Sequence, residues 1–175
     1  MKKYLLLLFL MFWFCNDAWA WGNVQEGFRG IKWGDSFVKR QDFEPIEGNR
    51  FEDFYRGDYS EEFNSYYTRK GDPLCIGDIA FTKIVYQATD GFLTAVMLHT
   101  VHFDQKTIDS LSNVFGKPED YPPAKLMGAF LWRVNTNKSL EPVGVVFARH
   151  VIMIRPVSLQ RRIEEEMRDQ IRQQD

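Results

Sequence analysis

The strongest constraint on the fold is an Asp-Gly pair, Asp90-Gly91, that lies between two apolar runs. Residues 81–88 are apolar and β-branched enough to predict a strand, and residues 92–101 predict the return strand. Asp-Gly between apolar segments favours the tight turn of a β-hairpin. Because the second run is apolar at most positions on both faces, we expect it to lie in the interior of a sheet. The sequence therefore predicts an antiparallel hairpin near the centre of a β-sheet.

The segments after this hairpin predict one helix and further strands. Asp104 is a typical N-cap, Ile108, Leu111 and Phe115 recur at helical spacing, and Gly116 is a helix stop. Further strands are predicted over residues 129–134, 143–148 and 150–154, and the last two are either separate strands or one bent strand. The predicted fold class is therefore α+β: an antiparallel sheet of four to five strands with the 104–116 helix packed on one face. A charged, peripheral helix is predicted over 157–175, because its apolar stripe is narrow.

The segments before the hairpin carry weaker signals. Residues 28–34 predict a short extended segment that ends at Gly34, and Asp35 or Ser36 is placed to cap one or two helical turns through Arg40. Residues 42–63 show no clean period and contain one Pro and two Gly, so they predict a loop with at most a broken helix.

The first twenty residues have the pattern of an export signal. Two lysines precede an apolar run over residues 4–15, and Ala18-Trp19-Ala20 follows the small-x-small rule of signal peptidase sites. We expect cleavage between Ala20 and Trp21, which leaves a single α+β domain over 21–156 and places the protein in the periplasm. The alternative is an uncleaved anchor in the inner membrane, since Trp19 and Trp21 would suit a membrane interface.

Composition argues against several classes of function. Lys and Arg number 22 against 24 Asp and Glu, so the chain is not a generally basic nucleic-acid binder. Two cysteines are too few for a disulfide scaffold or a Cys-rich zinc site, and the one that cleavage would leave, Cys75, is expected to be buried and unpaired.

His99 and His102 are three positions apart on a predicted strand end, so they should not converge on a metal. The sequence contains no phosphate-binding loop or nucleophile motif, and we predict no catalytic residue, metal or cofactor.

One segment has the composition of a contact surface. Residues 42–63 contain eight acidic residues and six interleaved aromatic residues. Aromatic side chains beside charges are typical of partner-facing surfaces. The predicted contact residues are Phe51, Phe54, Tyr55 and Tyr59. Two alternatives remain: the rings cover the sheet, or two of the acids act together in a small hydrolase or carbohydrate-active enzyme.

Several motifs together resemble those of a family of small, uncharacterised exported bacterial proteins that open with FRGIxWG. The matching segments are residues 28–34, 67–70, 77–78, 84–86 and 115–118, with Trp132 on the strand that follows. The resemblance covers about residues 28–155 and assigns no catalytic residue. It implies an exported protein, whose acidic segment at 42–63 and charged tail are features of this chain.

The sequence as a whole predicts an exported, non-enzymatic binding module of the cell envelope. Its expected partner is an envelope protein or cell-wall component with a cationic surface, because the contact segment is acidic. It would meet the membrane only through the signal segment before cleavage. The hydrolase and the inner-membrane-tethered protein remain the alternatives.

Overall fold

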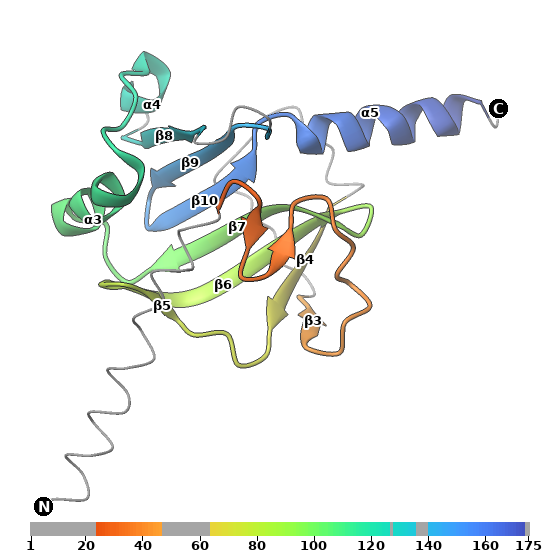
Figure 1. Ribbon diagram of the computed structural model, residues 1–175, viewed down its shortest axis with the longest axis horizontal. Helices are drawn as coiled ribbons and strands as arrows, with labels where there is room; N and C mark the ends of the chain where they lie inside the picture. The colour runs from red at the N-terminus through yellow and green to blue at the C-terminus, as the bar shows by residue number, and fades with distance from the viewer. Residues whose placement is uncertain (1–23, 47–63, 127, 136–139, 174–175) are drawn as a thin grey trace, which may run out of the picture.

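The computed structural model describes residues 24–46, 64–126, 128–135 and 140–173. Within these ranges the chain forms one antiparallel sheet of eight strands, a separate two-stranded hairpin and three helices (Figure 1). The strands of the large sheet are β3 (Phe43–Pro45), β4 (Asn64–Arg69), β5 (Cys75–Ile76), β6 (Ile79–Thr89), β7 (Phe92–Thr100), β8 (Phe130–Val134), β9 (Val143–Ala148) and β10 (Val151–Pro156). The separate hairpin consists of β1 (Gly27–Phe28) and β2 (Ile31–Lys32).

The predicted central hairpin is confirmed. β6 and β7 pair antiparallel along most of their length, and Asp90 and Gly91 between them both have positive φ, as a two-residue hairpin turn requires. The strand order is β3-β4-β6-β7-β10-β9-β8, with β5 paired to β6 outside this path. β6 and β7 thus lie in the interior of the sheet, which explains why most of their side chains are apolar on both faces.

The predicted fold class, α+β with four to five strands and one helix on a face, is wrong. The described chain is mostly β, and its main sheet has eight strands. The prediction missed β3, β4 and β5. β3 and β5 contain only three and two residues, and every residue of β4 is half-buried, so none of them shows an alternation of apolar and polar side chains.

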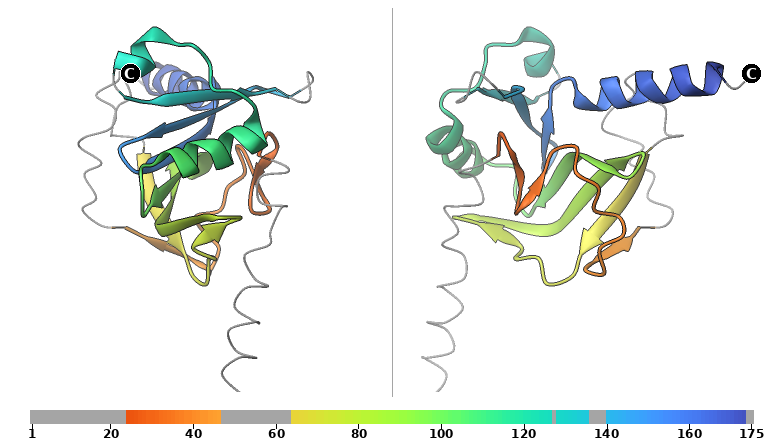
Figure 2. Two further views of the ribbon diagram at one scale, coloured as in Figure 1. Left: turned by 90° about the vertical axis from the view of Figure 1, so that its left-hand side faces the viewer. Right: turned by 45° about the vertical axis from the view of Figure 1, so that its right-hand side comes forward.

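The three helices lie at the two ends of the sheet (Figure 2). α3 (Gln105–Phe115) has the predicted bounds, with Asp104 accepting a hydrogen bond from the Thr107 backbone at 2.8 Å and Gly116 as the C-cap. Hydrogen bonds from the Thr107 backbone and hydroxyl lower the pKa of Asp104. The short α4 (Pro122–Leu126) follows and was not predicted.

α5 (Leu159–Arg172) projects from the opposite end of the sheet (Figure 1). Its first turn contacts the body of the protein, and Gln160 is buried there. Farther along, Ile163 and Met167 are half-buried and Ile171 is 50% exposed. None of the helices that the structure describes is long and apolar enough to cross a membrane.

The main hydrophobic core lies on one face of the sheet, beneath the β1–β2 hairpin and α3. Its largest fully buried side chains include Trp132, Tyr86, Phe28, Phe37 and Phe147. A smaller cluster of Val85, Met97 and Val151 lies on the other face. Both clusters come from alternate positions of the same strands, because successive side chains of a strand point to opposite faces.

Candidate functional site

The motif at residues 28–34 forms a hairpin, and the prediction of a single extended segment there is wrong. Phe28 pairs with Ile31, and Arg29 and Gly30 between them have φ of 49° and 80°. Both side chains of the pair are buried in the main core. A side chain at Gly27 would place its Cβ 2.0 Å from the Ile31 carbonyl oxygen, so only glycine permits this close approach of β1 and β2.

A buried ion pair fixes the turn of this hairpin to the large sheet. Arg29 Nη1 lies 3.0 Å from Asp72 Oδ1, and these side chains are only 10% and 7% exposed. The Tyr86 hydroxyl donates a hydrogen bond of 2.6 Å to Asp72 Oδ2. Burial, followed by the negative charge of Asp72, raises the pKa of Tyr86, so its hydroxyl keeps the proton that it donates. Arg29 Nη2 also donates to the Cys75 carbonyl oxygen at 3.0 Å, which ties the turn to β5.

Two of the acids from the 42–63 segment lie in the described chain, and both are ion-paired. Arg69 Nε donates to Asp42 Oδ2 at 2.8 Å, and Lys70 Nζ lies 2.8 Å from Glu44 Oε1. Desolvation opposes ionisation of Asp42, but the hydrogen bond from Arg69 and the nearby charge of Arg40 outweigh it and lower the pKa of this carboxyl. These two acids therefore act as partners of basic side chains across the β3–β4 edge.

The segment 35–40 forms no helix, and the predicted helical turns there are wrong. Instead it runs beside the start of β7. The Gly34 backbone N–H donates to the Leu93 carbonyl oxygen at 2.9 Å, and the Leu93 backbone N–H donates to the Asp35 carbonyl oxygen at 3.0 Å. Backbone pairing with a strand thus replaces the local helical bonds that Asp35 or Ser36 would have capped.

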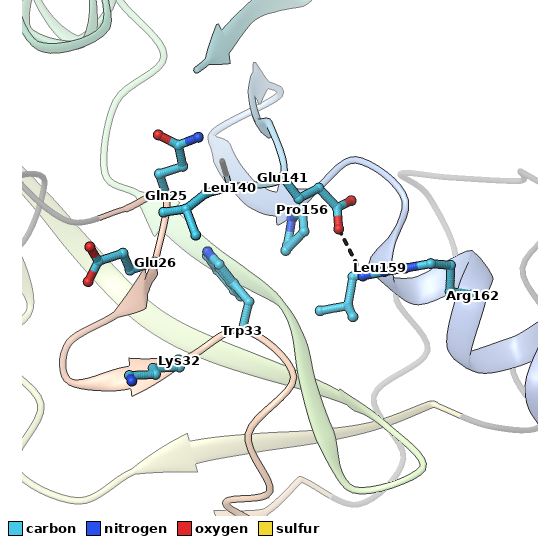
Figure 3. A pocket seen from close by; sticks show the side chains of 9 residues that line it. All are labelled: Gln25, Glu26, Lys32, Trp33, Leu140, Glu141, Pro156, Leu159 and Arg162. Carbon is cyan, nitrogen blue, oxygen red and sulfur yellow. Dashed lines mark hydrogen bonds and ion pairs between the residues drawn. The ribbon is translucent and has the colours of Figure 1, made fainter. Parts of the chain in front are cut away.

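Trp33, immediately after β2, forms a wall of a cleft between the hairpin and α5 (Figure 3). The cleft has a volume of about 480 Å³. Its apolar lining also includes Leu140, Pro156 and Leu159. The Trp33 indole N–H donates to the Val24 carbonyl oxygen at 2.8 Å, which fixes the orientation of the ring. The ring packs partly on the main core, and in Figure 3 it lies between the strand segments and the first turn of α5.

The far wall of the cleft depends on Glu141. One carboxylate oxygen, Oε1, accepts hydrogen bonds from the backbone N–H and the hydroxyl of Ser158, the hydroxyl at 2.7 Å. The other, Oε2, accepts from Arg162 Nη2 at 3.0 Å. Ser158 is the N-cap residue of α5 but makes no side-chain cap bond of its own, so Glu141 supplies the acceptor at this helix end. The carboxylate thereby joins the cleft wall to α5.

The charges that line the cleft are balanced. Glu26 and Lys32 are exposed on the hairpin side, whereas Glu141 and Arg162 form an ion pair on the α5 side. The cleft thus offers a fixed aromatic face, aliphatic walls, and both donors and acceptors of hydrogen bonds. This arrangement is suited to binding a small polar molecule that has an apolar face.

The residues predicted as a contact surface, Phe51, Phe54, Tyr55 and Tyr59, lie outside the described residues, and so do Ala20 and Trp21 at the predicted cleavage site. Those assignments stay predictions. The cleft was missed because its lining comes from segments far apart in the sequence. Its one local signal was Trp33, which stands in the 28–34 motif.

The prediction that Cys75 is buried is wrong, whereas its unpaired state was predicted for the chain that cleavage would leave and stays a prediction. Cys75 is half-buried and disulfide-bonded, and the other cysteine of the sequence, Cys15, lies outside the described residues. The setting of Leu74 and Ile76 suggested an apolar environment, yet Leu74 is 47% exposed. Leu74 precedes β5, and within the strand alternation separates Cys75 from its neighbour Ile76, which points into the main core.

The three histidines of the chain lie at the end of the sheet nearest α3. The Thr100 hydroxyl is 2.9 Å from the His102 carbonyl oxygen and 3.0 Å from that of His150, so the β9–β10 turn brings His150 beside the end of β7. Burial, and then the charge of Lys83, lowers the pKa of His99. Among the described residues, no group of three or more His, Cys, Asp or Glu is arranged to hold a metal ion.

No protein-family model matches this chain, and neither does any curated protein or any solved structure.

Proposed function

We propose that this protein is an exported, non-enzymatic binding module of the bacterial cell envelope, and that it holds its ligand in the Trp33 cleft. The observation that carries this proposal is the fixed orientation of Trp33. Its indole N–H is bonded within the protein, and its ring is positioned in a cleft of about 480 Å³. A ring that is already ordered loses little conformational freedom when a ligand packs on it.

The state of Glu141 favours binding over hydrolysis. A catalytic carboxyl in a glycosidase must give up a proton or attack a sugar carbon, and the second carboxyl must lie across the bond that breaks. Glu141 accepts hydrogen bonds from Ser158 and Arg162, which occupy both of its carboxylate oxygens. Its evident role is to hold the end of α5 at the cleft.

The location in the envelope is supported by the sequence of the first twenty residues. Two lysines, an apolar run and Ala18-x-Ala20 follow one another in the order of an export signal. The proposal therefore places the binding cleft in the periplasm, where envelope proteins and cell-wall components are within reach.

The test is affinity capture from an envelope extract with the mature protein and three variants. W33L keeps an apolar side chain against the core but removes the aromatic face, and K32E alters the lining charge at an exposed position. Y121A is the matched control, because Tyr121 is 49% exposed and is not part of the cleft lining.

We expect the wild type and Y121A to capture the same ligand, identified by mass spectrometry, and W33L and K32E to lose it. Thermal melting of each variant establishes that it is folded. Capture that is unchanged in both folded cleft variants would show that the Trp33 cleft is not the binding site.

A further inference from the structure

We infer that the ligand of the Trp33 cleft is a neutral saccharide that stacks on the indole ring. This inference rests on the proposed function and names the class of ligand. Three features of the cleft support it: the fixed aromatic face, the balance of charges in the lining, and the hydrogen bonds that nearby backbone groups already make within the protein.

The aromatic face is suited to a sugar ring. Because Trp33 Nε1 donates to the Val24 carbonyl oxygen, the indole has no N–H left for a ligand and offers an apolar surface only. Leu140 and Leu159 extend this apolar surface. The C–H groups on one side of a pyranose ring form a flat apolar patch of the kind that packs on such a wall, while its hydroxyl groups point outward.

The balance of charges favours a neutral ligand. Glu26 and Glu141 are matched by Lys32 and Arg162, so the formal charge of the lining is zero. An anion or a cation would be attracted by one member of each pair and repelled by the other. A hydroxyl group, in contrast, both donates and accepts, so it can bond to the carboxylate of Glu26 and to the ammonium of Lys32.

The backbone near the cleft argues against an extended peptide. Peptides commonly bind by adding a strand, which requires free backbone donors and acceptors. The Trp33 backbone N–H donates to the Glu26 carbonyl oxygen at 3.1 Å, and the Ser158 backbone N–H donates to Glu141. These two backbone N–H groups, one on each side of the cleft, are therefore already hydrogen-bonded within the protein. Side chains must then make the hydrogen bonds that recognise a ligand.

The test measures binding of soluble trisaccharides to the mature protein by calorimetry and ligand-observed NMR. The neutral probes are the trimers of N-acetylglucosamine, of β-1,4-linked glucose and of α-1,4-linked glucose. The matched charged probe is the trimer of glucosamine, which has the same backbone as the first probe but carries ammonium groups. A neutral, apolar tripeptide serves as the peptide probe.

We expect at least one neutral trimer to bind, with an affinity that is the same at low and at high salt. W33L should weaken this binding by about tenfold or more, because the loss of a stacked ring removes both contact area and its favourable geometry. Y121A should leave it unchanged. The glucosamine trimer should bind more weakly than its neutral counterpart.

Several results would overturn the inference: no neutral trimer binds, the binding survives in W33L, or the charged trimer or the tripeptide binds more tightly. These failures are distinct from failure of the proposed function. If capture from the extract depends on Trp33 while no saccharide binds, the cleft is a binding site for another class of ligand and only the saccharide assignment is lost.

Discussion

Removal of Asp72 should destabilise the protein strongly, because it leaves the Arg29 guanidinium buried without its counter-ion. The two side chains are 10% and 7% exposed, with 3.0 Å between Nη1 and Oδ1. Breaking a buried ion pair on one side costs about 3–5 kcal/mol. Domains of this size are stable by about 5–15 kcal/mol, so D72A should lose a large share of the total. Urea unfolding followed by circular dichroism measures this loss as a lower midpoint at constant slope.

A double-mutant cycle separates the ion pair from other effects of the substitution. R29M removes the charge but keeps an apolar stem, and the double variant R29M/D72A should be less destabilised than the sum of the two single variants. Y86F should cost about 1.5–3 kcal/mol, because the hydroxyl donates to the carboxylate that pairs with Arg29.

The exposed pair of Lys70 and Glu44 is the matched control for this cycle. These side chains are 63% and 56% exposed, so solvent screens their interaction and E44A should leave unfolding nearly unchanged. A loss below about 1 kcal/mol in D72A, or additive effects of R29M and D72A, would refute the view that this pair holds the hairpin to the sheet.

Four further outcomes are expected. D104A should lower the melting temperature, because α3 loses its N-cap, whereas D104S should retain most of the stability. The pKa of Asp104 is lowered in the folded protein, so this carboxylate contributes to the free energy of unfolding above its ordinary pKa of 3.8. That contribution is lost as the pH falls through the folded pKa. The melting temperature of D104S should therefore depend less on pH in this acid range than that of the wild type. Truncation after Arg162 should leave one cooperative unfolding transition, since the described side chains beyond it are half-buried or exposed, and loss of that transition would place the rest of α5 in the core. The intact mass of the exported protein should lack residues 1–20, whereas a membrane-bound product that retains Met1 would identify an uncleaved anchor.

The sequence alone determined the elements whose signals are local. Asp90-Gly91 fixes the β6–β7 turn because both positions need positive φ, and the apolar runs on its two sides place these strands inside the sheet. Asp104 and Gly116 fix the two ends of α3 in the same way, through backbone bonds within a few residues. Each of these features depends on neighbours in the chain, so a pattern in one sequence is sufficient to predict it.

Only the tertiary structure decided the extent of the sheet and the position of the candidate site. β4 has no periodic pattern of its own and becomes a strand because it pairs with β6 on one side and β3 on the other. Arg29 and Asp72 belong to no common motif in the sequence, and folding brings them together as a buried ion pair. The Trp33 cleft likewise joins the β1–β2 hairpin to the start of α5. Contacts between distant segments depend on how the strands are ordered, and strand order is not encoded in any local run of residues.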